Sequence, residues 1–239
     1  MAKRLARDGV EVVLAARRKP ELEAVAEEVR ALGGKARVVV VDVADATATV
    51  AAIRAADEAV GGLDLVVANA GIGTAIHATK LTWERIQAAT RVNFEGAIAT
   101  LTAVLPAMVV RDRGHLVGIS SVGALAPFPT GNIYSASKAG LSMFLESVRL
   151  DLKSTGVDVT IVHPGVVKTP MTANLKRVPP MAIESDAAAD LIIGRLSAAP
   201  PTIDFPTPMV ATIRALAALP RPLRDSALLR FPTPDDGEA

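Results

Sequence analysis

A series of short apolar runs, separated by stretches with helical periodicity, constrains the fold of this chain more than any other feature. Each run has the length of a strand, and several are apolar at nearly every position, as parallel strands covered on both faces are. In chain order the runs are Val10–Ala15, Ala36–Val41, Leu63–Ala68, His115–Ile119, Val157–Val162 and Thr202–Phe205. Strands that alternate with helices over short connections predict an α/β fold, a doubly wound parallel sheet in a single domain.

Helices are expected between these runs. Met1–Asp8 has the pattern of the last turns of a helix that Gly9 ends. Pro20 favours the start of the next helix, and Leu22, Val25, Val29 and Leu32 would form its buried stripe. Further helices are expected over Ala46–Val60, over Trp83–Val110 with a break near Arg91, from near Tyr134, and over Glu184–Ala198. Ligands of such folds bind at the carboxyl ends of the strands.

Composition excludes several classes of function. The 239 residues carry a formal net charge of +1, without a basic run or stripe, which argues against a nucleic-acid partner. The absence of cysteine excludes disulfides, thiolate chemistry and cysteine-based zinc sites. The histidines His77, His115 and His163 are isolated and have no metal-site spacing, so we predict no metal site and interpret each as a strand-end or loop residue.

The chain shows no targeting signal. Its first residues form a charged helix rather than the apolar segment of a signal peptide. The longest weakly polar run, Gly96–Val110, is too short to cross a bilayer and contains Pro106, so we interpret it as a buried interface helix. We expect a cytoplasmic protein.

The stretch from Gly114 to Leu141, GHLVGISSVGALAPFPTGNIYSASKAGL, carries the chemistry. Its apolar strand ends in two serines, and a loop rich in glycine and proline leads to a helix with Tyr134 and, four residues on, Lys138. Residues i and i+4 share a helix face, so the lysine ammonium is expected to lower the tyrosine pKa from its reference of about 10. A serine at the strand end would hold the same substrate oxygen. The simpler reading is a tyrosine at a helix start with an exposed lysine.

Ser121, Tyr134 and Lys138, a serine followed by YxxxK, resemble the active site of the short-chain dehydrogenase/reductase family. The resemblance covers roughly residues 1–206 and implies a Rossmann-like domain. It also implies that Tyr134 is the acid/base, that Lys138 lowers its pKa and binds ribose, and that Ser121 polarises the substrate oxygen. Asn93, in VNFEG, matches a helix asparagine that supports a proton relay. Asparagine is unfavourable inside a helix, which gives the match weight.

The same resemblance indicates a dinucleotide site. Arg17 and Arg18 directly follow the strand Val10–Ala15. In dinucleotide-binding folds the end of this strand contacts the adenosine ribose, and an arginine there binds a 2′-phosphate. This predicts NADP(H) in preference to NAD(H); the alternative is two solvated arginines before a helix. Asp42 and Val43 resemble the pair that contacts adenine, although an aspartate at a strand end is also a common helix N-cap.

Two loops complete the expected cofactor site. Asn69, Ala70 and Gly71 resemble the NAG motif of the family, with an ordinary turn as the alternative. Pro164 and Gly165 resemble its PG motif, which implies that the backbone near Val167 and the hydroxyl of Thr169 hold the nicotinamide carboxamide. The following residues, 170–180, would form a substrate lid. The apolar residues in and beside it, which favour a small hydrophobic substrate, are Met171, Leu175, Val178 and Met181.

The family pattern begins with a strand and a TGxxxGxG turn that cradles the pyrophosphate. Met1 falls inside the helix that would follow, so we expect an N-terminally shortened domain. The missing strand would lie between Val10–Ala15 and Leu63–Ala68. Three explanations remain open: a start codon assigned too late, a cofactor-poor relative that rearranges its sheet or borrows a strand, and weak cofactor binding. We favour the first, because the site residues are intact.

Residues 207–239 form an extension in which prolines punctuate apolar residues and arginines. Over 207–231 the alternatives are amphipathic helices on a membrane surface and packing against the protein itself, which we favour. We expect an NADP(H)-preferring oxidoreductase that interconverts a carbonyl and an alcohol. The alternative is a non-catalytic binding or scaffold protein on a degenerate fold of the same family. The helices over Val92–Val110 and Tyr134–Thr155 resemble the family's oligomer interface, which implies a homodimer or homotetramer.

Overall fold

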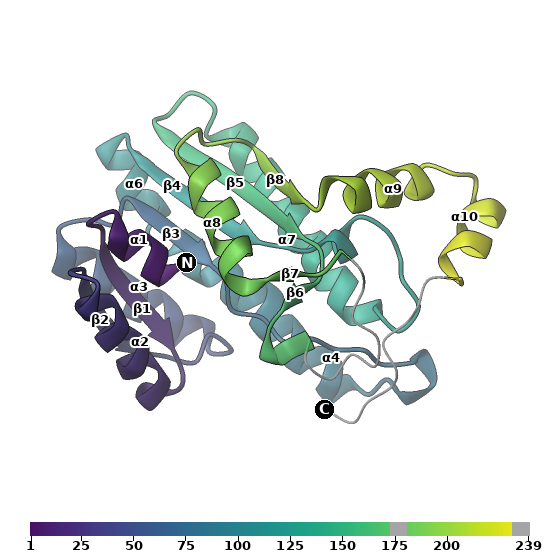
Figure 1. Ribbon diagram of the computed structural model, residues 1–239, viewed down its shortest axis with the longest axis horizontal. Coiled ribbons are helices and arrows are strands. Elements are labelled where there is room, and N and C mark those ends of the chain that lie inside the picture. The colour runs from purple at the N-terminus through teal and green to yellow at the C-terminus, as the bar shows by residue number, and fades with distance from the viewer. Residues whose placement is uncertain (173–180, 231–239) are drawn as a thin grey trace.

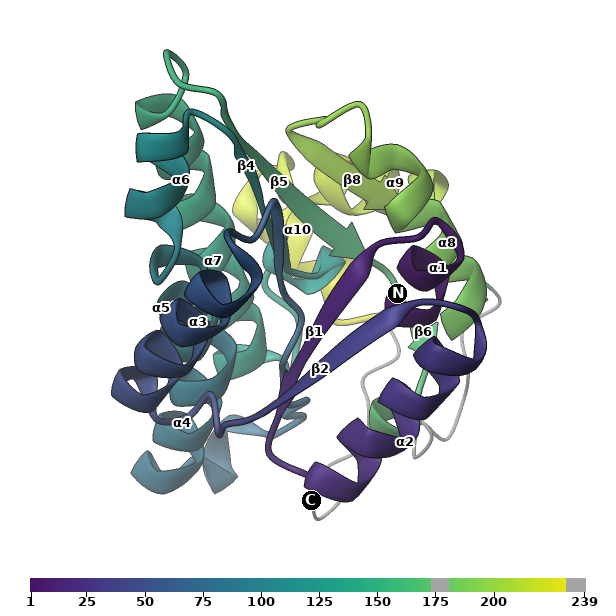
Figure 2. The same cartoon turned by 90° about the vertical axis from the view of Figure 1, so that its left-hand side faces the viewer.

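The computed structural model describes residues 1–172 and 181–230 as a parallel sheet between helices (Figure 1). One four-stranded sheet has the order β3-β4-β5-β8. Its strands are β3 (Leu65–Ala68), β4 (Gly114–Ile119), β5 (Val157–Pro164) and β8 (Thr202–Phe205). Figure 2 shows the strands between one layer that contains α3, α5, α6 and α7 and another that contains α1, α2 and α8. The predicted doubly wound α/β fold is confirmed.

The strands β1 (Glu11–Ala16) and β2 (Lys35–Val40) form a separate two-stranded sheet. They pair in parallel and lie side by side in Figure 2. Among the described residues no strand joins β1 to β3 by hydrogen bonds. The sheet is therefore interrupted at the place where the sequence predicts a missing strand.

Helix α1 (Ala2–Arg7) bridges the two parts of the molecule. It contacts α2 (Lys19–Ala31) and β1 on one side and α8 (Ser185–Leu196) on the other. Arg4 forms ion pairs with Asp8 at 2.6 Å and with Asp190 of α8 at 3.3 Å. Leu5 packs against the apolar cluster that contains Ile192. These contacts hold the β1–β2 unit against the main sheet without strand pairing.

Helix α3 (Ala46–Val60) has the bounds that the sequence predicts. Its N-cap is Asp45, whose side chain accepts a hydrogen bond from the amide of Ala48 at 2.9 Å. Gly61 ends the helix with a φ of 76°, a left-handed conformation that favours glycine.

The long helical run over residues 83–111 changes its winding where a break is predicted. It consists of α4 (Trp83–Thr90), a π-helical segment η2 (Arg91–Gly96), α5 (Ala97–Thr102) and α6 (Leu105–Arg111). A side chain at position 96 would collide with the carbonyl of Val43, so the glycine permits this close approach. Single π-turns inside helices are rare and are frequent at functional sites.

The run over residues 83–111 is longer than the apolar stretch expected from the sequence. By length and composition alone it is the one described helix apolar enough to cross a membrane. A core helix passes the same test, and α5 packs against β3 and β4.

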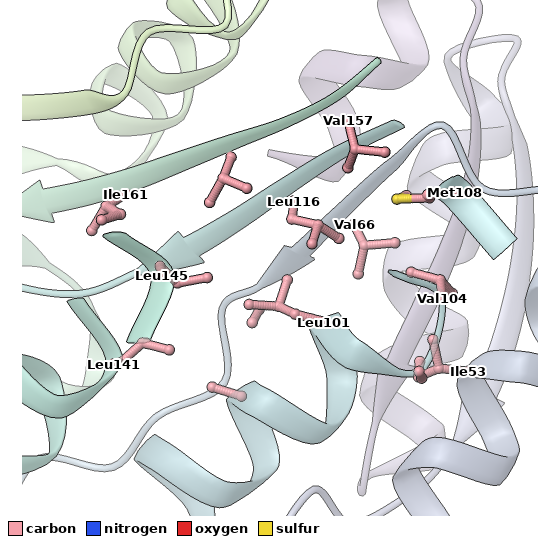
Figure 3. Close-up of a cluster of buried hydrophobic side chains, with 14 residues drawn as sticks. Ile53, Val66, Leu101, Val104, Met108, Leu116, Leu141, Leu145, Val157 and Ile161 are labelled. Carbon is pink, nitrogen blue, oxygen red and sulfur yellow. The ribbon is translucent and has the colours of Figure 1, made fainter. Parts of the chain in front are cut away.

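A cluster of buried side chains joins these helices to the sheet (Figure 3). It contains Leu101 of α5, Met108 of α6 and Leu116 of β4, while Leu141 and Leu145 come from α7 (Asn132–Asp151). All five are at most 1% exposed. Burying each such side chain contributes about 1.5–3 kcal/mol, so this cluster fixes α7 on the sheet.

The C-terminal extension forms α9 (Thr207–Ala217) and α10 (Arg221–Leu228). Val210, Ile213 and Leu228 are buried, the last two in a cluster with Ala126. This burial supports packing against the protein rather than a free amphipathic face. A membrane contact over 207–231 stays an untested prediction, and Phe231 lies outside the described residues.

The remaining elements are short. They are η1 (Ala78–Lys80), η3 (Val122–Ala124), β6 (Val167–Lys168), η4 (Pro170–Thr172) and β7 (Ile183–Glu184). Strands β6 and β7 pair in parallel beside the end of β5.

Candidate active site

Tyr134 and Lys138 lie in the first two turns of α7, which begins two residues before the tyrosine. Lys138 is 4% exposed, and its ammonium donates a hydrogen bond of 2.8 Å to the carbonyl of Ile119 at the end of β4. An ammonium has three N–H donors. The simpler reading of the sequence, an exposed lysine at a helix start, is wrong.

Ser121 follows β4 and faces the same helix. It is buried, its hydroxyl accepts a hydrogen bond of 3.0 Å from the amide of Gly123, and it also hydrogen-bonds Tyr134. A Cβ at Gly123 would lie 3.4 Å from both the Ser121 hydroxyl and the Tyr134 ring. The structure thus brings the serine and the tyrosine together as the sequence predicts.

The electrostatics of the pair differ from the expectation. Burial raises the pKa of Tyr134, and the hydrogen bond with Ser121 acts in the opposite direction. Burial also lowers the pKa of Lys138 to about 8. The net shift of the Tyr134 pKa is therefore upward rather than downward, because burial is its largest cause and the ammonium of Lys138 is bound to Ile119. The role of Lys138 toward the tyrosine stays a prediction.

Asn93 connects the π-helical segment to the loop after β3. It is fully buried, and its amide accepts from the Ile72 N–H at 2.8 Å and donates to the Ile72 carbonyl at 3.0 Å. It also donates to the hydroxyl of Ser137 at 3.3 Å. A Cβ at Gly71 would lie 3.4 Å from Asn93 Oδ1 and 3.5 Å from Lys138 Nζ. Asn93 and Lys138 thus meet at this glycine; the proton relay stays a prediction.

Asn69 and Ala70, the other residues of the NAG motif, directly follow β3 and are exposed. They lie at the carboxyl end of the strand, on the same edge of the sheet as Ser121. Their position agrees with the expected cofactor site, and their contacts with a cofactor stay predictions.

Arg17 and Asp42 lie at the carboxyl ends of the paired strands β1 and β2. The Arg17 guanidinium is 3.7 Å from the Asp42 carboxylate, and both side chains are largely exposed. Arg18 instead pairs with Glu21 in the first turn of α2, at 3.1 Å. Asp42 accepts from the amide of Ala44 at 3.0 Å and does not cap α3. The alternative reading of Asp42 as a helix N-cap is therefore wrong.

The loop after β5 is held by backbone bonds. The Gly165 amide donates to the Phe205 carbonyl at 2.7 Å, and Pro164 ends β5. The Val167 carbonyl accepts from the Thr172 hydroxyl at 2.7 Å, and that hydroxyl also accepts from the Thr169 amide at 3.0 Å. The loop therefore has a defined shape at the carboxyl end of β5.

The expected lid is described in part. Met171 and Met181 at its two ends are 52% and 41% exposed. Leu175 and Val178 lie outside the described residues.

Two features of the site are not evident from the sequence. Asn132 in the first turn of α7 holds the loop after β3 through the carbonyl of Ile76, at 2.6 Å. His163, expected to be an isolated strand-end residue, is buried between Ser142 and Asp204. The sequence does not indicate the role of Asn132, because an asparagine at a helix start is common. It does not indicate the role of His163, because the partners of this residue come from other elements. Residues 1–172 and 181–230 contain no cluster of metal-ligating side chains.

The arrangement suits the nicotinamide ribose of a dinucleotide cofactor better than it suits the pyrophosphate. A buried ammonium beside Gly71, the buried hydroxyl of Ser121 and the hydroxyl of the half-buried Tyr134 provide donors for a ribose and for a substrate oxygen. The pyrophosphate of a dinucleotide binds a glycine-rich turn at the start of a helix after the central strand. The described residues between β1 and β3 provide no such turn.

Comparison with known proteins finds similar sequences. A sequence model of the family described as short chain dehydrogenase matches residues 1–179. An uncharacterized oxidoreductase of Myxococcus xanthus is 45% identical over 227 residues, which are 95% of this chain and 90% of that protein.

Two solved structures extend this similarity to three dimensions. A metagenomic short-chain oxidoreductase in complex with NADP is 31% identical, with a TM-score of 0.71 over 82% of this chain and 83% of that one. An alcohol dehydrogenase from Thermococcus sibiricus, complexed with 5-hydroxy-NADP, is 25% identical, with a TM-score of 0.76 over 85% and 88% of the two chains.

Proposed function

The chain belongs to the short-chain dehydrogenase family of NAD(P)-dependent oxidoreductases, and we propose that it interconverts a small hydrophobic carbonyl compound and the corresponding alcohol. The observation that carries the proposal is the convergence of Ser121, Tyr134 and Lys138 at the carboxyl end of β4. The exposed methionines Met171 and Met181, at the two ends of the expected lid, support a hydrophobic substrate.

When bound, the nicotinamide cofactor supplies or accepts the hydride. In the reductive direction the Tyr134 hydroxyl donates a proton to the carbonyl oxygen, while the Ser121 hydroxyl donates a hydrogen bond to the same oxygen. The raised pKa keeps Tyr134 protonated near neutral pH, as an acid must be. Lys138 holds the ribose, and its charge then stabilises the phenolate that remains after proton transfer. Asn93 fixes the loop that carries Gly71 beside the lysine and supports the proton relay.

We propose NADP(H) as the preferred cofactor. Arg17 supports this, because its guanidinium is exposed at the end of β1 and its one ion pair among the described residues is long, at 3.7 Å. A planar guanidinium matches the geometry of a phosphate. The NADP ligands of the two related structures lend further support.

The decisive experiment measures NADPH oxidation with a panel of hydrophobic ketones and aldehydes, in the wild type and in Tyr134→Phe. Loss of general acid catalysis reduces turnover by roughly 10²–10⁴-fold. The affinity for NADPH and the melting temperature should stay close to the wild-type values. A Tyr134→Phe variant that turns over like the wild type would refute the assignment.

The interrupted sheet favours a second candidate, a binding or scaffold protein without catalysis. Among the described residues no strand pairing joins the sheet β1-β2 to the sheet β3-β4-β5-β8. A dinucleotide would lose two or three charge-assisted backbone bonds there, at roughly 1.5–3 kcal/mol each. A folded chain that binds neither NADPH nor NADH in a direct titration would support this candidate, whereas tight binding of NADPH supports the enzyme.

We further propose a homodimer or homotetramer formed through α5, α6 and α7. Met143 and Leu150 of α7 and Val110 of α6 are 70%, 62% and 86% exposed, which is unusual for large apolar residues that share one helical layer. Light scattering of the purified protein, with Met143→Lys and Leu150→Lys as variants, tests this.

A further inference from the structure

A chain of hydrogen bonds, exposed at Arg214 and partly buried beyond it, links the C-terminal extension to α7. His163, at the end of β5, has a side chain that is 5% exposed. Its Nδ1 is 2.8 Å from Asp204 Oδ1 on β8, and its Nε2 is 3.2 Å from the hydroxyl of Ser142 on α7. The other carboxylate oxygen of Asp204 pairs with Arg214 of α9 at 2.7 Å. The chain therefore crosses the sheet from α9 to α7.

At its inner end the chain reaches the backbone of the candidate catalytic lysine. The Ser142 hydroxyl lies 2.7 Å from the hydroxyl of Ser120, and each is 3.0 Å from the carbonyl of Lys138. Ser120 is the residue before Ser121, which faces Tyr134. The turn 138–142 of α7 is thus attached to the ends of β4 and β5.

The donors and acceptors of the chain allow a consistent assignment. A carboxylate only accepts, so His163 carries its proton on Nδ1 and donates it to Asp204. The bare Nε2 then accepts the one hydrogen of the Ser142 hydroxyl, and the Ser120 hydroxyl donates its own hydrogen to the Ser142 oxygen. In this pattern each member restrains the next, and a change at Asp204 reaches Ser142, one helical turn after Lys138 on α7, in two hydrogen bonds.

The hydrogen bonds from Ser142 to His163 and from His163 to Asp204 resemble those of a hydrolytic catalytic triad. The surroundings of the Ser142 hydroxyl, however, do not suit a nucleophile. The Ser142 hydroxyl already contacts Ser120 and the Lys138 carbonyl in the interior of α7. A nucleophilic serine needs a free approach and an adjacent oxyanion site. A positioning role fits these contacts better.

Helix α9 makes a second contact with the active-site region. Met209 and Ile213 belong to the apolar cluster with Val122 and Ala126, in the loop that follows Ser121. A Cβ at Gly165 would lie 3.0 Å from the sulfur of Met209. Movement of α9 therefore affects both the serine loop and the loop expected to hold the nicotinamide.

We propose that His163 is a positioning residue for the turn of α7 that carries Lys138. The chain Arg214–Asp204–His163–Ser142 couples the position of α9 to the position of that turn. The inference rests on the proposed function for its effect on turnover. The coupling itself is a property of the folded chain without substrate.

The test begins at Arg214, because its side chain is 53% exposed and its loss leaves no cavity. Arg214→Ala is compared with Arg224→Ala, a change in the same extension whose ion pair with Asp225 stays within α10. We expect amide hydrogen exchange over residues 138–142 to become about fivefold faster or more in Arg214→Ala, the lower end of usual coupling between sites. Arg224→Ala should leave exchange there unchanged.

Turnover provides the second readout. In Arg214→Ala we expect kcat to fall by about fivefold with little change in the KM for NADPH, since the chain ends beneath the reacting groups. Arg214→Lys keeps the charge beside Asp204 and should recover most of the loss. His163→Asn keeps a donor near Asp204 but cannot reach Ser142, so it should resemble Arg214→Ala in both readouts.

The two readouts separate the inference from the proposed function. Faster exchange at 138–142 in a protein that reduces no carbonyl compound would support the coupling and count against the enzyme. Exchange that changes only within β8 and α9, together with a kcat equal to that of Arg224→Ala, would overturn the coupling.

Discussion

The side-chain amide of Asn132 donates a hydrogen bond of 2.6 Å to the carbonyl of Ile76. The amide of Ile76 in turn donates to the carbonyl of Thr130 at 2.9 Å. Both backbone groups of Ile76 are thus bound by the residues that precede Tyr134. Because Asn93 binds both backbone groups of Ile72, the loop after β3 is held at two points, one on each of the helices that frame the site.

Asn132→Asp tests this contact without changing the size of the side chain. The carboxylate cannot donate to the Ile76 carbonyl and places a negative charge against it. An acid in the first turn of α7 stabilises the helix by about 0.3–1 kcal/mol, which offsets part of the lost bond. We expect kcat to fall by roughly tenfold while the melting temperature changes little. Steady-state kinetics and calorimetry on one preparation check both; a fall in stability with unchanged kcat would contradict a positioning role.

The buried lysine makes stability depend on pH. In the unfolded chain Lys138 has its ordinary pKa of 10.5, whereas burial lowers it to about 8 in the folded protein. Below pH 8 the folded state carries the full cost of the buried charge, on the order of 3 kcal/mol. Between pH 8 and 10.5 the unfolded state binds more protons, so this cost declines as pH rises.

Lys138→Met removes that cost together with the ammonium that we propose binds the ribose. We therefore expect the variant to be inactive and more stable than the wild type at pH 7, by at most the cost of the buried charge, since the bond to Ile119 is lost as well. The difference should shrink as pH rises through 8 to 10.5. Urea unfolding of both proteins at several pH values measures it. A difference that stays constant with pH would contradict the lowered pKa.

Arg17 and Arg18 are adjacent in sequence but are expected to affect the cofactor differently. Arg17 extends toward Asp42 at the end of β2, whereas Arg18 is occupied by Glu21. A charge-assisted contact contributes about 1.5–3 kcal/mol, or about 10- to 100-fold in Kd. We expect Arg17→Ala to weaken NADPH by that factor and NADH hardly at all. Arg18→Ala is the comparison and should change NADPH affinity less; equal losses would assign the phosphate contact to both.

The sequence predicts local elements well where one segment determines them. The bounds of Ala46–Val60 and of Thr202–Phe205 are confirmed, because a cap or a flanking proline marks their ends. The meeting of Ser121 with Tyr134 is predicted too, since short connections leave the two elements little freedom. The sequence does not predict the direction of the Tyr134 pKa shift, because this direction depends on how deeply the finished fold buries the ring.

Contacts between elements that are distant in the sequence cannot be predicted from the sequence of one segment. His163 meets Asp204 and Ser142 only after β5, β8 and α7 have packed, and each of these residues alone is unremarkable in sequence. The gap between β1 and β3 is the opposite case. A missing element of a repeating pattern is visible in the sequence, and the structure places the interruption where the pattern requires it.

Gly96 provides a last test, at the junction of the π-helical segment and the predicted adenine site. A Cβ at this position would collide with the backbone carbonyl of Val43, which cannot rotate away as a side chain can. Overpacking of this kind costs about 1–3 kcal/mol. We expect Gly96→Ala to lower the free energy of unfolding by that amount and, because Val43 has to move, to weaken NADPH binding.

The control is Gly194→Ala, in α8, where an added Cβ meets no atom within 4 Å. Alanine is favoured over glycine inside a helix by roughly 0.5–1 kcal/mol, so this variant should be more stable than the wild type. Urea unfolding and an NADPH titration on the two variants separate the effects. If Gly96→Ala is stabilised like Gly194→Ala, then η2 and the loop after β2 are less closely packed than the structure shows, and Val43 has no fixed place in the cofactor site.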